Sequence, residues 1–304
     1  MKCLLNIYAE DLIPGKLITF ARNYGFDGIR RDILWYTSIT TLDSIVNQAL
    51  RNRDLTWIYL IGGLHEGSPL SPSPKVFAEN ARGVAAAVAR AGSPSNIIFD
   101  LGVEATIVKY YKTNQPLYAE SINLAAQAIH ELIPSATVIC ETTESTTVER
   151  LEWVSQFVPL LNSNIAVSMH TYRPSDKPCA GFGTIDEMFK AIKEIIGGRV
   201  WWNTETGWHG ALIKQGLCKT WWLSWLVDLL KIKCAWRYTE AEIASFVTKE
   251  ISYHEQYGAA GFVVYQAFTG STDTSEAQFG LLEYITREPK LRAELIKAFL
   301  LERK

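Results

Sequence analysis

The feature that most constrains the fold of this chain is a regular alternation of short apolar runs with helical patterns. Several of these runs are almost continuously apolar, as expected for parallel strands that are covered on both faces. Eight such runs recur along the 304 residues, at 3–9, 26–33, 55–62, 96–103, 136–142, 164–172, 199–205 and 261–268. Eight strands that alternate with helices are typical of a (β/α)₈ barrel. We therefore predict an α/β protein folded as a single (β/α)₈ (TIM) barrel domain over residues 1–304.

The segments between the runs carry helix signals. Residues 75–92 and 116–132 place apolar side chains at steps of three and four, and a last helix is expected at about 289–301. Four segments have the spacing of a capping box, in which a hydroxyl and a carboxylate satisfy free N–H groups of the first turn: 40–43, 146–149, 184–187 and 239–242. A doubly wound open sheet is the competing architecture. It usually has a glycine-rich turn after the first strand, and NIYAEDLIPG offers none.

Three longer segments depart from the minimal barrel unit. Residues 62–74 and 171–183 are rich in Pro, Gly and Ser, and we expect them to be loops on the face where barrel active sites are built. Residues 206–238 separate the seventh strand from its helix and are rich in tryptophan. We predict that this segment is a helical insertion or lid on the barrel.

Composition restricts the partners and the compartment. A formal net charge of -2 with no basic run argues against nucleic acid as a partner. No apolar run has the roughly 18 to 20 residues of a membrane span, and the N-terminal apolar stretch is too short for a signal peptide. The five cysteines are odd in number and include no Cys-x-x-Cys, which indicates buried thiols rather than disulfides or a zinc site. A cytoplasmic location is expected.

Two strands end on a glutamate. Glu104 follows the fourth run and Glu205 closes the seventh, and in a barrel both side chains would point over the same mouth. Two neighbouring carboxyl groups can divide the roles of acid and nucleophile, because closeness and burial push their pKa values apart. Cleavage of a glycosidic bond needs this pair of roles. The simpler alternative is that each glutamate only forms a salt bridge within the barrel.

At this point the chain resembles glycoside hydrolase clan A, the (β/α)₈ retaining glycosidases, over most of its length, and families such as 39 and 5 in particular. The order and spacing of several motifs carry the resemblance together: YGFDGIRRDILW, IIFDLGVEAT, AVSMHTY, VWWNTETGW and GFVVYQAF.

The resemblance implies a retaining glycosidase that acts on an oligo- or polysaccharide without cofactor or metal. By position in the motifs, Glu205 would be the nucleophile and Glu104 the acid/base, with carboxyl groups about 5 to 5.5 Å apart. Arg30, His170 and Tyr172 match residues around the sugar, and Tyr172 is expected to hydrogen-bond Glu205.

Further residues are expected near the sugar or beneath it. Trp208 is predicted as a wall of the sugar site, and His65 and Tyr265 as further substrate-binding residues. The tryptophans around Glu205, including Trp201 and Trp202, are expected to exclude water from it.

Arg30 and Asp32 share a face of the second strand, and Arg30 can form a structural ion pair with Asp32 or with Asp100.

Two other functions stay open. Val103 stands where the clan usually has an asparagine that binds the sugar 2-hydroxyl, so the barrel can also be one that binds carbohydrate without cleaving it. A metal-dependent lyase or isomerase is the other alternative, with ligands among His65, Glu66, His170, Glu205 and His209. No pair of these residues has a known metal-motif spacing, so no metal is predicted.

Overall fold

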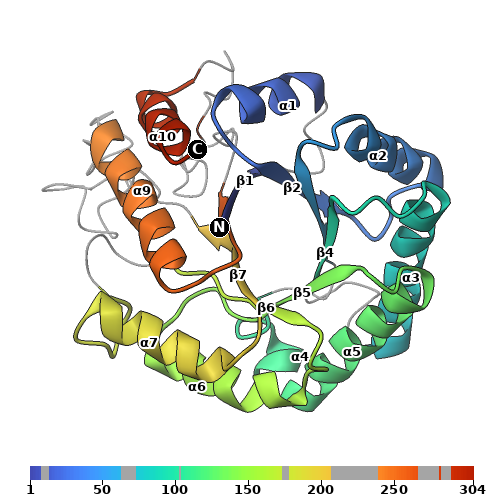
Figure 1. Ribbon diagram of the computed structural model, residues 1–304. Helices are drawn as coiled ribbons and strands as arrows, with labels where there is room; N and C mark the ends of the chain where they lie inside the picture. Colours follow the sequence, from blue (N-terminus) through green and yellow to red (C-terminus); the bar gives the residue numbers. More distant parts are fainter. Residues whose placement is uncertain are drawn as a thin grey trace, which may run out of the picture.

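The computed structural model describes residues 1–7, 14–62, 73–102, 104–172, 178–206, 239–265, 281 and 289–304. Eight parallel strands pair in chain order, and β1 pairs with β8 to close the barrel (Figure 1). The strands are β1 (Lys2–Ile7), β2 (Gly28–Ile33), β3 (Thr56–Ile61), β4 (Ile97–Leu101), β5 (Thr137–Glu141), β6 (Ala166–Ser168), β7 (Trp201–Thr206) and β8 (Gly261–Val264). The predicted (β/α)₈ barrel is confirmed. Most of the predicted insertion and of the first predicted loop lies outside the described residues, as do residues 173–177 of the second predicted loop.

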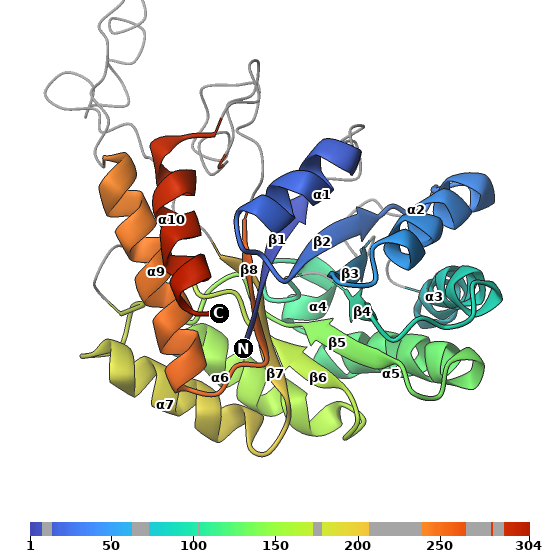
Figure 2. The same cartoon turned by 45° about the horizontal axis from the view of Figure 1, so that its top comes forward.

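Helices surround the barrel, and α9 and α10 lie side by side next to β8 and β1 (Figure 2). They are α1 (Pro14–Asn23), α2 (Ile39–Arg51), α3 (Pro74–Arg90), α4 (Lys109–Lys112), α5 (Gln115–Leu132), α6 (Val148–Phe157), the short 3₁₀ helix η1 (Val158–Leu160), α7 (Ile185–Ile196), α9 (Glu240–Gln256) and α10 (Leu291–Glu302). In the described ranges, no helix combines the length and the apolar character that a membrane span requires.

The capping boxes were predicted correctly at two helices and wrongly at two. Thr184 and Thr239 cap α7 and α9, each with the expected glutamate. At α2 the cap is Ser38 rather than Thr40, and at α6 it is Thr147 rather than Thr146. Both of these starts offer several hydroxyl residues close together, so local spacing is ambiguous. Which hydroxyl residue caps the helix depends on where the helix begins, and the packing of the helix's apolar face against the barrel determines that position.

The bottom of the barrel interior is apolar. Its side chains come from alternate positions of the strands and form one buried cluster: Leu4, Ile58, Ile98, Ile139, Ala166, Trp202 and Val263. The Trp202 ring occupies the space above Gly261, where a Cβ atom would lie 2.1 Å from it. Trp201 points outward and packs with Phe189. Both tryptophans are therefore core residues, and the prediction that they surround Glu205 is wrong, because strand alternation directs them elsewhere.

One layer higher, the interior becomes polar. Asn6, Arg30, Asp100, Glu141, Ser168 and Thr204 are all buried there. Charged groups at this depth are stable only when they are paired and hydrogen-bonded. This polar layer is the floor of the barrel mouth and supports the site described below.

Gly102 determines how the chain leaves β4. Its φ of +104° suits glycine, and a Cβ atom there would lie 2.1 Å from the Tyr118 hydroxyl.

We expect Gly102→Ala to lower the free energy of unfolding by about 2 to 5 kcal/mol through strain and overpacking, measured by urea denaturation. Gly92→Ala is the matched control, since Gly92 has a φ of +86° with open space around its Cβ position. Gly92→Ala should lower the free energy of unfolding by about 1 to 2 kcal/mol. Equal losses of unfolding free energy in the two variants would contradict a close contact at Gly102.

Candidate active site

A cavity of about 420 Å³ opens at the carboxyl ends of the strands. Its charged lining consists of Arg30, Asp32, Glu104, Glu141, His170 and Glu205, which come from β2, β5, β7 and the segments that follow β4 and β6. Trp35 and Tyr36 line it as well and are exposed. Active sites of TIM barrels are built on this face from the ends of several strands. The cavity is therefore the candidate active site.

Glu104 is held by a histidine. It comes two residues after Gly102, whose positive φ turns the chain at the end of β4. Its Oε1 atom lies 2.7 Å from Nδ1 of His170, which is buried, while the Glu104 side chain stays 23% exposed. The carboxyl group is therefore oriented by the protein and still open to a ligand.

Glu205 reaches the cavity because β7 is irregular. The β7–β8 register takes three steps on β7, from Asn203 to Thr206, against two on β8, which indicates a β-bulge. Thr204 bonds to residues of the barrel interior, whereas Asn203 contacts His254 of α9 outside it. In a regular strand Glu205 would also face outward; the extra residue lets it follow Thr204 into the cavity.

Among the described residues, Tyr172 and Arg30 contact the Glu205 carboxylate. The Tyr172 hydroxyl donates to Oε1 at 2.9 Å, as predicted, and an Arg30 nitrogen lies 3.5 Å from Oε2. Burial raises the pKa of Glu205 above its ordinary value, and the positive charges of His170 and Arg30 oppose that rise.

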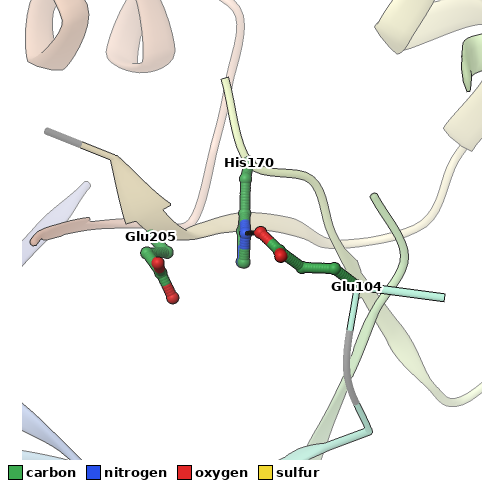
Figure 3. Close-up of side chains that lie close together, drawn as sticks. All are labelled: Glu104, His170 and Glu205. Carbon is green, nitrogen blue, oxygen red and sulfur yellow. Dashed lines mark hydrogen bonds and ion pairs between the residues drawn. The ribbon is translucent and has the colours of Figure 1, made fainter. Parts of the chain in front are cut away.

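The two predicted catalytic glutamates converge. One polar atom each of Glu104, His170 and Glu205 lie within 4.8 Å of one another. In Figure 3 the two glutamates lie on either side of the His170 ring, and a dashed line joins His170 to Glu104. The convergence that the strand-end pattern predicts is therefore present in the fold.

Arg30 is the centre of the polar layer. Its Nε donates to Asp100 at 3.1 Å, one terminal nitrogen donates to Asn6 at 3.0 Å, and the other pairs with Glu141. The expected ion pair of Arg30 is thus formed with Asp100. Asp32 is not an ion-pair partner of Arg30 in the described part of the chain.

Glu141 is a site residue that the sequence analysis missed. It is 3% exposed at the end of β5 and pairs with Arg30. Its Oε1 also accepts a hydrogen bond from Thr204 at 3.3 Å and lies 3.4 Å from Nε2 of His170. In the run ATVICET a glutamate, Glu141, stands at the end of the strand, just as Glu104 follows the fourth run and Glu205 closes the seventh. The same strand-end criterion would have found it.

The buried network separates the charge states of its members. Burial alone would raise the pKa of Glu141, but Arg30, His170 and Thr204 outweigh it and bring that pKa to about 2. Burial alone would lower the pKa of His170, but the hydrogen bonds to Glu104 and Glu141 raise it well above its ordinary value. The network therefore favours the carboxylate form of Glu141 and the cationic form of His170.

The other predicted site residues are only partly tested by the structure. Tyr265 follows β8 and its backbone N–H donates to Thr206, but the described cavity lining does not include it. His65, Val103 and Trp208 lie outside the described residues.

Glu104, His170 and Glu205 also have the atom types and spacing to hold a metal ion. A metal would first have to displace the hydrogen bond between His170 Nδ1 and Glu104.

Comparisons with known proteins find similarity in structure alone. No family model matches the sequence, and no curated protein matches it. An exo-β-1,4-mannosidase from Opitutaceae bacterium strain TAV5 shares 15% identity at a TM-score of 0.69; the match covers 100% of this chain and 59% of the mannosidase. The chain thus spans about 59% of the length of that protein.

Two further solved structures match over nearly their whole length. Cel5A of Thermotoga maritima has 14% identity and a TM-score of 0.58, with 97% of this chain and 95% of Cel5A covered. An endo-β-1,4-glucanase from Xanthomonas axonopodis pv. citri has 12% identity and a TM-score of 0.65, with 99% of both chains covered. These identities show a shared fold, which is the barrel that the resemblance to clan A implied.

Glu141→Gln tests the buried network through stability. The pKa of Glu141 is lowered from 4.5 to about 2 in the folded protein, so its ionisation stabilises the fold above pH 4.5 and less as the pH falls toward 2. At pH 7 we expect the variant to lose about 3 to 5 kcal/mol of unfolding free energy, because Arg30 and His170 lose a buried partner. The loss should shrink between pH 4.5 and pH 2 in denaturant titrations.

Glu131→Gln is the control for this variant. Glu131 forms an exposed ion pair with Arg82, which water screens, so its removal should change stability little at any pH. Equal effects of the two substitutions at pH 7 would mean that Glu141 is not the charge partner described above.

Proposed function

We propose that this protein is a retaining glycoside hydrolase, with Glu205 as the nucleophile and Glu104 as the acid/base. The observation that carries the proposal is that one carboxylate oxygen of Glu104 and one of Glu205 lie within 4.8 Å of each other across one cavity. Retaining glycosidases place these groups about 5 to 5.5 Å apart, whereas inverting enzymes leave about 6.5 to 9.5 Å for a water molecule. The spacing supports retention.

In the first step, a carboxylate oxygen of Glu205 attacks the anomeric carbon and the bond from that carbon to the leaving oxygen breaks. Glu104 gives its proton to the leaving oxygen, and a covalent glycosyl-enzyme remains. Tyr172 and Arg30 contact the Glu205 carboxylate from two directions. They fix the direction of attack and keep the nucleophile charged although it is buried.

In the second step, water attacks the same carbon from the side that the leaving group has vacated. Glu104 accepts the proton of that water, and Glu205 leaves as a carboxylate. Two inversions give net retention. The 2.7 Å contact with His170 holds Glu104 in one place for both proton transfers, and Glu141 holds His170 from the other side.

The names of the similar structures support a β-linked substrate. They describe an exo-β-1,4-mannosidase and endo-β-1,4-glucanases, all of which cleave β-1,4 bonds between sugars. We propose an oligo- or polysaccharide with β-linked hexoses as the substrate of this chain.

The test of the function is hydrolysis of 4-nitrophenyl and 2,4-dinitrophenyl β-glycosides. Glu205→Gln should reduce kcat at least about 1,000-fold, because no covalent intermediate can form. Glu104→Gln should lose far less kcat/KM on the dinitrophenyl substrate, because kcat/KM reports the first step and this leaving group needs no proton, and NMR of the first product should show the retained anomer. Full activity of Glu205→Gln, or an inverted product, would contradict the proposal.

Tyr172→Phe tests the state of the nucleophile. The hydroxyl favours the charged form of Glu205 by donating to it, so its loss should raise the pKa of Glu205 further. We expect the acid limb of the kcat/KM profile to move to higher pH and kcat to fall roughly 10-fold. Tyr257→Phe is the control, because its hydroxyl bonds Asp186 outside the cavity. An acid limb unchanged in Tyr172→Phe would show that this hydroxyl does not influence the nucleophile.

A further inference from the structure

Asp32 is the one charged group of the described cavity lining that the proposed mechanism does not use. It lies near the end of β2, two positions after Arg30 on the same face of the strand, beside Leu60 of β3. Its carboxylate forms no hydrogen bond and no ion pair with any residue in the described part of the chain. The partners of Arg30 are instead Asn6, Asp100 and Glu141.

Such a carboxylate is costly for the folded protein. Burial raises the pKa of Asp32, the charge of Arg30 partly opposes this, and the charge of Glu141 adds to it. A partly buried acid that lacks hydrogen-bond donors is less stable than the same acid in water. A side chain that costs stability and points into a binding cavity is typical of a residue kept for its ligand.

The charge balance of the cavity restricts that ligand. Among the described lining residues, Arg30 and His170 are the only cations, and both are already held by carboxylates. The described part of the lining therefore offers no unoccupied cation to a sugar carboxylate or sulfate, while Asp32 would repel either. Hydroxyl and amino groups, by contrast, can donate to Asp32.

The rim next to Asp32 suits a sugar ring. Trp35 and Tyr36 follow β2, line the same cavity and are 42% and 63% exposed. The centroids of the two rings lie 5.3 Å apart, and the rings pack edge to face. Aromatic faces of this kind pack against the C–H groups of sugars. Asp32 and these rings together provide acceptor oxygens and apolar surface on one side of the cavity.

We propose that Asp32 is a substrate-binding residue that accepts hydrogen bonds from the sugar and selects neutral or amino sugars against uronic acids and sulfated sugars. The inference rests on the proposed function, since it assigns the substrate class of the same cavity. Asp32 contacts the sugar directly and sets its orientation, and it takes no part in the bond changes.

The test compares wild type, Asp32→Asn and Asp32→Ala on 4-nitrophenyl β-D-glucoside, mannoside, glucosaminide and glucuronide. Wild type should prefer the best neutral or amino glycoside over the glucuronide at least about 100-fold in kcat/KM. Asp32→Asn should lower kcat/KM for that preferred glycoside roughly 10- to 100-fold, because the substrate loses its hydrogen bonds to a charged group. A larger loss for the glucosaminide than for the glucoside would identify the amino group as the donor.

A stability measurement separates binding from a structural role. Because Asp32 has no described partner, Asp32→Asn should keep or raise the Tm. Asp43→Asn is the control, since Asp43 pairs with Arg90 at the surface and should leave kcat/KM unchanged. A lowered Tm of Asp32→Asn would show that Asp32 has a structural partner and would overturn the proposal.

Calorimetric binding of iminosugars of gluco and manno configuration distinguishes failure of this inference from failure of the function. If wild type hydrolyses no glycoside but binds an iminosugar roughly 10- to 100-fold more tightly than Asp32→Asn does, the hydrolase proposal fails and the role of Asp32 stands. If Asp32→Asn matches wild type in both kcat/KM and Kd, or if wild type cleaves the glucuronide as well as the glucoside, the inference on Asp32 is wrong. No binding and no hydrolysis by wild type overturns both.

Discussion

The buried guanidinium of Arg30 is the interaction on which the site depends. It is buried in the barrel interior and binds Asp100, Glu141 and Asn6, while Glu205 Oε2 lies 3.5 Å away. Without this cation, the carboxylates of the polar layer would repel one another in a region where water cannot screen them. Arg30 thus allows the barrel interior to change from an apolar bottom to a charged floor within one layer of side chains.

That floor gives neighbouring acids different properties. Glu141 stays ionised because Arg30 and His170 outweigh its burial, whereas burial dominates at Glu205 and raises its pKa. The hydrogen bonds of His170 to Glu104 and Glu141 raise its pKa and favour its cationic form. The carboxyl groups differ in exposure too. The Glu141 side chain is buried, while the side chains of Glu104 and Glu205 remain about one-fifth exposed. The same side-chain type therefore supplies a structural anchor in one place and groups open to a ligand in others.

Stability and function separate within the cavity lining. The cations of the floor, Arg30 and His170, are paired with carboxylates, which stabilises the fold but leaves these cations little capacity for a ligand. Asp32 lies above them without a described partner and is the acceptor that a bound sugar would find available. The proposed preference for neutral or amino sugars follows from this difference between paired and unpaired charge.

The sequence by itself determined the barrel, because eight apolar runs that alternate with helical patterns leave few other ways to bury their surface. It also indicated Glu104 and Glu205, since the strand ends of a parallel barrel meet at one mouth. Only the tertiary structure decided that Trp202 fills the barrel bottom, that a bulge turns Glu205 inward, and that Glu141 joins Arg30. These outcomes depend on register and on contacts between distant strands, and the order of residues along one strand carries no information about its neighbour's register.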